Sequence, residues 1–280
     1  MVWILAQGIF ESVAAPVWGA LSRAVGEPVP LYPYSMLAAT TAACWIALRF
    51  QLEAPWALAG FPAGAWSLRS LGVGLATGTA ALLLTTLGLV LAGAMTFESV
   101  SMTDGSGMTD GWWDTALRVL VVLAPAALWE ELAFRGFLQG IVVEALGAAR
   151  AAPLVGRAVA SVSFGVVHLA NPGAGVRTTG IVMLAGWCLS LLREHQGLPA
   201  AWAAHLAWNW IMAAVLHVAV SGLPFATPGY RGVLHGPDWL SGGGWGPEGG
   251  LVAALVLGGV ALWSARESLR SSTSGGARLA

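Results

Sequence analysis

The chain has 280 residues, of which 57% are hydrophobic and 10% are charged, and its mean hydropathy is +0.73. A soluble domain carries about 25% charged residues, so this composition excludes a water-soluble globular protein and indicates an integral membrane protein. The net charge of −1 provides no basic field of the kind that binds nucleic acid.

Residues 1–22 are the first apolar stretch. They lack the basic start of a signal peptide and carry Glu11. Such a segment fits either a membrane span or an amphipathic helix that lies in the interface. Of the two, we expect a span.

Further apolar ranges follow along the chain. A membrane-spanning helix needs about 20 mostly apolar residues. The ranges that meet this need are 30–48, 70–96, 116–143, 158–176, 178–192, 198–220 and 250–265. We therefore expect an all-α, polytopic bundle of about seven to eight transmembrane helices in one membrane domain (1–280), with a core at 115–220. Cys44 and Cys188 lie inside apolar ranges without CxxC spacing, and both are predicted to be buried thiols.

Loop charges indicate the orientation of these spans. An alternating path places most loop arginines on one side, which the positive-inside rule assigns to the cytoplasm together with the C-terminus. These arginines are Arg49, Arg69, Arg150, Arg157, Arg193, Arg266, Arg270 and Arg278, whereas Arg23 and Arg177 fall on the other side. The acidic loop 98–114 and the Gly/Pro-rich segment 221–249 are predicted to be exposed on the non-cytoplasmic side of a cell membrane, and the tail 266–280 to be flexible.

The stretch "WEELAFRGFLQG" (129–140) places three charges near the middle of the range 116–143. Three unpaired charges at membrane depth would cost on the order of 8–10 kcal/mol. Glu131 and Arg135 are spaced i, i+4, so they share a helix face and can pair. Glu130 is rotated by about 100° from that face. It therefore needs a partner from another helix or water in a cavity.

Two other ranges carry polar groups that complement this carboxylate. "SFGVVHLA" places Phe164 and His168 one turn apart, and "AAHLAWNW" places His205 and Asn209 one turn apart. A carboxylate without a local partner can act as a general base on water, a neutral imidazole can orient that water, and a second imidazole with a carboxamide can stabilise an oxyanion. We expect Glu130 to meet His168 across a helix interface.

The same residues allow other interpretations. Polar side chains in membrane helices often bridge helices without chemistry, and a charged cluster also suits a small-solute or proton transporter. His195, His217 and His235 lie at span ends or in loops and are expected to be structural. Zinc bound by Glu130, His168 and His205 would suit the donor set, although there is no HExxH motif, and a metal-free mechanism needs the same groups.

The ordered motifs EExxxR (Glu130, Glu131, Arg135), FxxxH (Phe164, His168) and HxxxN (His205, Asn209) resemble the CAAX protease and bacteriocin-processing family. This family comprises multi-span intramembrane endopeptidases related to the type II CAAX prenyl endopeptidases. The resemblance covers roughly residues 115–220.

The resemblance implies catalytic roles for these positions. Glu130 would activate water with His168 beside it, and His205 and Asn209 would stabilise the oxyanion. Glu131 would assist, and Arg135 would hold the carboxylates. The implied substrates are membrane-associated, prenylated or secreted peptides, and a catalytically inactive scaffold is the alternative within the same fold. The family is described both with zinc and as metal-free, so the cofactor stays open.

Overall fold

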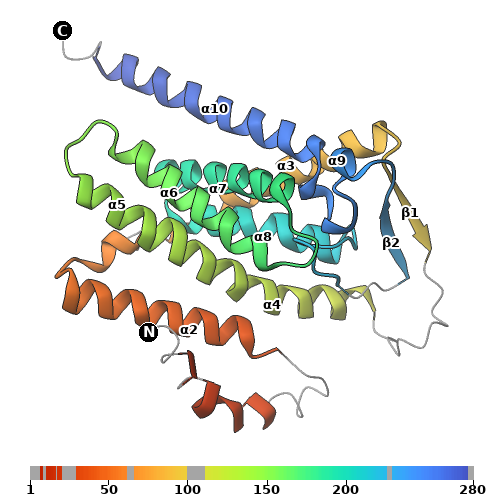
Figure 1. The fold of residues 1–280 in the computed structure, drawn as a ribbon, viewed down its shortest axis with the longest axis horizontal. Coiled ribbons are helices and arrows are strands. Elements are labelled where there is room, and N and C mark those ends of the chain that lie inside the picture. The colour runs from red at the N-terminus through yellow and green to blue at the C-terminus, as the bar shows by residue number, and fades with distance from the viewer. Residues whose placement is uncertain are drawn as a thin grey trace.

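The computed structural model describes residues 7–8, 11–16, 18–20, 30–61, 66–99, 111–225 and 229–276. Long helices lie side by side, and a two-stranded sheet sits at one end of the bundle (Figure 1). The helices are α2 (Tyr32–Ile46), α3 (Leu68–Leu91), α4 (Trp112–Glu131), α5 (Gln139–Leu146), α6 (Ala152–Val167), α7 (Val176–Gln196), α8 (Leu198–Ala214), α9 (Asp238–Ser241) and α10 (Leu251–Gly276). The strands are β1 (Met95–Ser99) and β2 (Tyr230–Leu234).

Every apolar range from 30–48 to 250–265 contains a helix, as predicted. By length and hydropathy, two helical stretches are candidate membrane spans, Leu68–Leu91 and Ala152–Ala170, and Leu251–Ser264 is a shorter apolar helix. The total of seven or eight spans therefore stays a prediction. The expected span at 1–22 falls largely outside the described residues.

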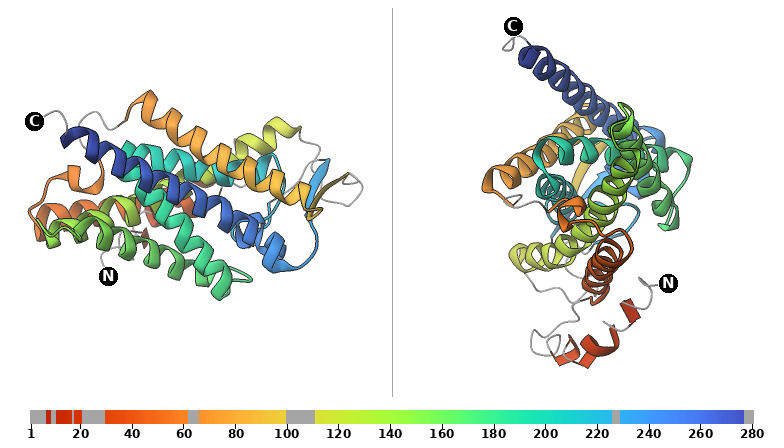
Figure 2. Two further views of the ribbon diagram at one scale, coloured as in Figure 1. Left: turned by 90° about the horizontal axis from the view of Figure 1, so that it is seen from above. Right: turned by 90° about the vertical axis from the view of Figure 1, so that its left-hand side faces the viewer.

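Helix α8 runs through the middle of the bundle, where it contacts α3, α4 and α7 (Figure 2). The closest approach is to α3, because Gly74 and Gly78 present no side chain to it. A Cβ on either glycine would collide with the carbonyl oxygen of Ala200 or Ala204 on α8. Small residues spaced by four are a common means of bringing membrane helices together. This contact fixes the depth at which α8 holds its polar side chains.

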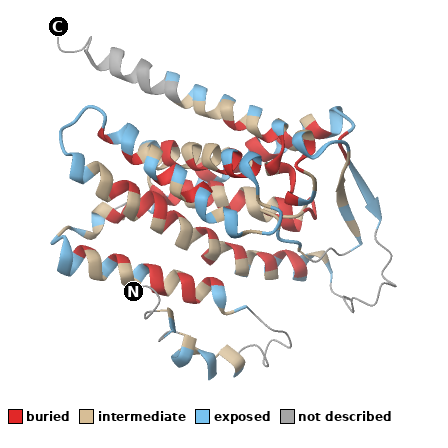
Figure 3. Ribbon diagram, in the orientation of Figure 1, coloured by how far each residue is buried: buried red, intermediate tan, exposed pale blue. Residues whose placement is uncertain are grey.

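The outer faces of the bundle are apolar. Buried residues line the helix faces that meet inside the bundle, and exposed residues lie on the outer faces (Figure 3). On α3, the side chains of Leu83, Leu84 and Leu87 are 52%, 56% and 53% exposed. Apolar side chains in such number on the outside of a helix are suited to contact with lipid.

The described residues of the segment 221–249 are in part folded against the bundle: Trp239 is exposed, as predicted for the whole segment, whereas Ser241 and Trp245 are buried. β2 pairs antiparallel with β1, with Met95 opposite Leu234 and Ser99 opposite Tyr230. Trp245 is 3% exposed and belongs to a buried cluster that also contains Phe134, Phe164 and Val182. The segment closes one end of the bundle, and its sheet departs from the all-α class that we expected.

Candidate active site

The helix that carries the EExxxR motif is seated by glycines. Glu130 and Glu131 end α4, and the chain continues as a π-helical segment, Leu132–Leu138, into α5. A Cβ on Gly136 or Gly140 would collide with a carbonyl oxygen of the 3-10 turn Trp56–Ala59. The short contact with this turn holds the helix in place directly beyond the two glutamates. π-Helical turns often occur at functional sites.

Glu131 and Arg135 form the ion pair that their spacing predicts. Arg135 Nη1 donates to Glu131 Oε1 at 3.0 Å, and both side chains are fully buried. His205 on α8 donates from Nδ1 to the same carboxylate oxygen at 2.8 Å. The buried carboxylate thus has a guanidinium on its own helix and an imidazole on another, which offsets the cost of burying it.

Phe164 of α6 connects the three motifs. The guanidinium carbon of Arg135 lies 3.9 Å from the centre of its ring. The ring centroid is 4.5 Å from that of His168 and 5.9 Å from that of His205. Gly186 of α7 leaves room for this stack, because a Cβ there would lie 3.2 Å from both Arg135 and Phe164. The phenylalanine of FxxxH therefore positions side chains of the other two motifs.

Glu130 pairs with His205 and not with His168. Its Oε2 lies 3.9 Å from His205 Nε2, and its side chain is 20% exposed. His168 instead donates from Nδ1 to the carbonyl oxygen of Phe164 at 2.7 Å. Between these two described residues, no Glu130 oxygen comes within ion-pair distance of the His168 ring. His205 is therefore bracketed by two carboxylates, with Glu131 at Nδ1 and Glu130 at Nε2.

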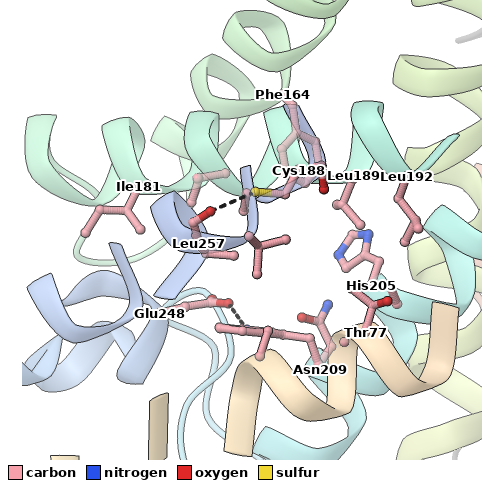
Figure 4. A pocket seen from close by; sticks show the side chains of 18 of the residues that line it. Thr77, Phe164, Ile181, Cys188, Leu189, Leu192, His205, Asn209, Glu248 and Leu257 are labelled. Carbon is pink, nitrogen blue, oxygen red and sulfur yellow. Dashed lines mark hydrogen bonds between the residues drawn. The ribbon is translucent and has the colours of Figure 1, made fainter. Parts of the chain in front are cut away.

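A cavity of about 480 Å³ lies next to this cluster, between α3, α7, α8 and α10. Its wall includes His168, His205 and Asn209, together with mostly apolar side chains from the surrounding helices. Figure 4 shows His205 and Asn209 directed into it from α8. Glu130 is not part of this wall and reaches the cavity through His205. The second and third motifs thus share one cavity, and the first adjoins it.

The cavity wall also contains Glu248 and Ser221, which the sequence reading missed. Glu248 Oε1 accepts hydrogen bonds from the backbone N and the Oγ of Ser221, both at 2.6 Å, and Oε2 accepts one from Trp208 Nε1 at 3.0 Å. These residues lie in or beside the segment that we expected to be exposed. No local pattern marks Glu248, because its position depends on the fold of the whole segment.

The structure also describes the other histidines and the two cysteines that the sequence analysis named. His195 lines the cavity, His217 is buried with Nδ1 donating to Ala213 O at 3.1 Å, and His235 contacts Thr96 at 2.6 Å. Both cysteines are free thiols; Cys44 is buried, as predicted, whereas Cys188 lines the cavity and is only partly buried.

A metal site is not formed by the described side chains. Among residues that the structure describes, no group of three or more His, Cys, Asp or Glu side chains is placed to hold a metal ion. Glu130 and His205 approach each other, but His168 does not join them as a third ligand. Zinc at Glu130, His168 and His205 stays a prediction from the resemblance, and the chemistry proposed below uses protein side chains.

Comparison with known proteins identifies this region of the chain. Residues 112–211 match the model of the family described as type II CAAX prenyl endopeptidase Rce1-like. No curated protein and no solved structure matches the chain. The matched range begins at the start of α4, ends within α8 and contains the EExxxR, FxxxH and HxxxN motifs. That family is a membrane-embedded protease family, and the similarity of residues 112–211 to its model supports the resemblance that the three motifs indicated.

Proposed function

We propose that the protein is an intramembrane endopeptidase in which Glu130 activates water for attack on a peptide bond. The observation that carries this proposal is the bracketing of His205 by Glu130 and Glu131, beside a cavity that also holds His168 and Asn209. The substrates are membrane-associated peptides, either prenylated or secreted. The residue roles rest on the chemistry of these groups together with the family match.

Glu130 is the carboxylate available for general-base chemistry. Glu131 is fully buried and is engaged by both Arg135 and His205, whereas Glu130 keeps 20% of its side-chain surface accessible. A water oxygen about 2.8 Å from both Glu130 Oε2 and His205 Nε2 would fit above their 3.9 Å separation. Glu130 would take a proton from this water as the water oxygen attacks the carbonyl carbon, and it would give that proton to the leaving amine nitrogen as the C–N bond breaks.

His205 and Asn209 would stabilise the resulting oxyanion. Because Nδ1 of His205 is fixed to Glu131, its Nε2 points to the side on which Glu130 lies. With both ring nitrogens protonated, His205 brings the formal charge of Glu130, Glu131, Arg135 and His205 to zero, and Nε2–H can donate. Asn209, one turn further along α8, adds a neutral donor from the cavity wall.

The arginine-bearing ends of the helices support one common side for the catalytic bundle. Arg157 near the start of α6 pairs with Glu194 near the end of α7 at 2.6 Å, and Gln139 of α5 donates to the same carboxylate at 2.8 Å. The helix ends that carry Arg157 and Arg193 therefore lie together. We assign this end to the cytoplasm, with the protein in the cell membrane.

The test is peptide cleavage by purified protein, followed by mass spectrometry of the products. General-base catalysis contributes roughly 10²–10⁴-fold, so Glu130→Gln is expected to lower kcat by at least about 100-fold while the thermal unfolding temperature is kept. Glu144→Gln is the matched control and should cleave normally, because Glu144 is an exposed glutamate on α5, which continues from α4. Full turnover by Glu130→Gln would contradict the assignment.

The same preparations separate the alternative functions. Solute or proton flux into proteoliposomes that depends on Glu130, without cleavage, would indicate a transporter. A scaffold would be indicated by two results together. Folded wild-type protein would show neither cleavage nor flux, and a strain that carries Glu130→Ala would keep the wild-type phenotype.

A further inference from the structure

Glu248 stands apart from the other groups that face the cavity. Among the described residues of the cavity wall, it is the only Asp, Glu, Lys or Arg. The others are apolar side chains, three histidines and a few uncharged polar groups. The charge of a protonated His205 is matched by Glu130 and Glu131, so Glu248 is the formal charge in this wall that is left for a group filling the cavity.

The Glu248 carboxylate is held by neutral donors. It accepts from Ser221 N, Ser221 Oγ and Trp208 Nε1, and no arginine or histidine pairs with it among the described residues. Arg177 donates from Nε to the backbone carbonyl oxygen of Gly249, the residue that follows Glu248. The three hydrogen bonds fix the position of the carboxylate, but their donors are neutral and leave its charge uncompensated.

The two carboxylate oxygens differ in what they can still accept. Oε1 already takes both Ser221 donors, whereas Oε2 takes a single hydrogen bond from Trp208. A carboxylate oxygen has about two lone-pair sites, so Oε2 keeps one. A cation at this oxygen would also lie beside the Trp208 indole, which lines the same cavity, and an aromatic ring next to a carboxylate favours cations.

The support of this carboxylate is built into the fold. Ser221 adopts φ +50, and its carbonyl oxygen accepts a hydrogen bond from Asn171 Nδ2 at 3.0 Å. A non-glycine residue at positive φ costs free energy, and these contacts hold it there. Because the carboxylate is already held in one position, binding of a cationic group costs little conformational entropy of the Glu248 side chain.

Glu248 also lies close to the catalytic groups along α8. Its partner Trp208 is adjacent in sequence to Asn209 and three residues after His205. Figure 4 shows Glu248 across the same cavity from His205. A peptide with its scissile carbonyl at His205 and Asn209 would therefore place a nearby residue against Glu248.

We propose that Glu248 and Trp208 form a specificity subsite for a basic residue, Arg or Lys, of the peptide substrate near the scissile bond. This inference rests on the proposed peptidase function and adds a substrate class to it. A neutral or acidic residue at the same position would leave the Glu248 charge unpaired or repelled.

The experiment compares quenched fluorescent peptides that are identical except at one position. An arginine is moved residue by residue across both sides of the cleavage site, and each peptide is paired with its citrulline version, which has nearly the same shape and no charge. For the wild-type protein we expect kcat/KM to favour arginine by about tenfold or more at one position. Glu248→Gln should remove this preference while retaining cleavage of the citrulline peptide, and the exposed Glu98→Gln serves as the charge-matched control.

Binding of the same peptides to Glu130→Gln protein separates the two proposals. The subsite is supported if Glu130→Gln protein binds the arginine peptide more tightly than the citrulline peptide and the Glu130→Gln/Glu248→Gln double variant does not. This holds even where no cleavage is measured. If wild-type protein cleaves or binds arginine and citrulline peptides equally at every position, the subsite is overturned and the peptidase function is unaffected. That comparison needs no Glu248 variant, so a misfolded Glu248→Gln protein would not obscure the result.

Discussion

Glu131 and Glu248 are both fixed carboxylates in the same bundle, but their surroundings differ in charge. Glu131 is fully buried and contacts the Arg135 guanidinium and the His205 imidazole. Glu248 lines a cavity and is held by two donors from Ser221 and one from Trp208, all of them uncharged. Glu131 is compensated inside the protein, and Glu248 leaves its charge to whatever enters the cavity.

This difference suggests two separate uses of negative charge. The charges around Glu131 orient one another and fix the His205 ring through its Nδ1, so they act within the protein. The charge on Glu248 is available to a ligand, because neutral hydrogen bonds position a carboxylate without cancelling it. Variants that remove either kind of partner should therefore have different consequences.

The largest effect is expected from removing the cation that compensates Glu131. Arg135→Met leaves the buried carboxylate with the imidazole alone, and loss of one partner of a buried pair costs about 3–5 kcal/mol of unfolding free energy. Denaturation of the purified protein would measure this. Arg231→Met is the control, because its pair with Glu98 is 58% and 49% exposed and should contribute about 1 kcal/mol or less. Equal losses in the two variants would contradict the proposed role of charge compensation at Glu131.

A second variant should disturb both carboxylates at once. Helix α8 carries His205, which contacts Glu131, and Trp208, which contacts Glu248. Gly78→Ala would push a Cβ against Ala204 O and displace α8, with a cost of about 1–3 kcal/mol and a fall in turnover. Gly72→Ala on the same helix meets no atom within 4 Å and should be neutral or slightly stabilising. Unchanged activity in a folded Gly78→Ala protein would show that the depth of α8 does not govern the site.

Local sequence patterns were sufficient for much of the helical bundle and for the Glu131–Arg135 pair. Helix period and the i, i+4 rule concern residues on one helix, and these predictions were confirmed. The spacing of Gly74 and Gly78 also carried a signal for close helix contact, which tertiary structure was needed to assign to α8. His168, His205 and Asn209 line one cavity, but the imidazole facing Glu130 is that of His205 and not that of His168, which we expected.

The segment 221–249 could not be predicted in the same way. Its glycines and prolines are typical of loops, and the pairing of β1 with β2 joins Met95 to Leu234 over a long stretch of chain. Its burial follows from the place of Trp245 in one buried cluster with Phe164 and from the hydrogen bond between Glu248 and Trp208, which join distant parts of the sequence. A local pattern contains no information about such contacts, so Glu248 was not recognised.

The smallest effect, and the one that separates charge from hydrogen bonding at Glu248, is expected from Ser221→Ala. This change removes the Oγ donor but keeps the backbone N–H on Glu248 Oε1, so the unfolding free energy should fall by only about 0.5–1.5 kcal/mol. Because the carboxylate keeps its charge, Ser221→Ala should still favour arginine over citrulline peptides. Ser161→Ala, whose hydroxyl donates to the Arg157 carbonyl within one helix, is the control for loss of a buried hydroxyl. If Ser221→Ala abolished the arginine preference as completely as Glu248→Gln, the geometry of the carboxylate, and not its uncompensated charge, would be the property that selects the substrate.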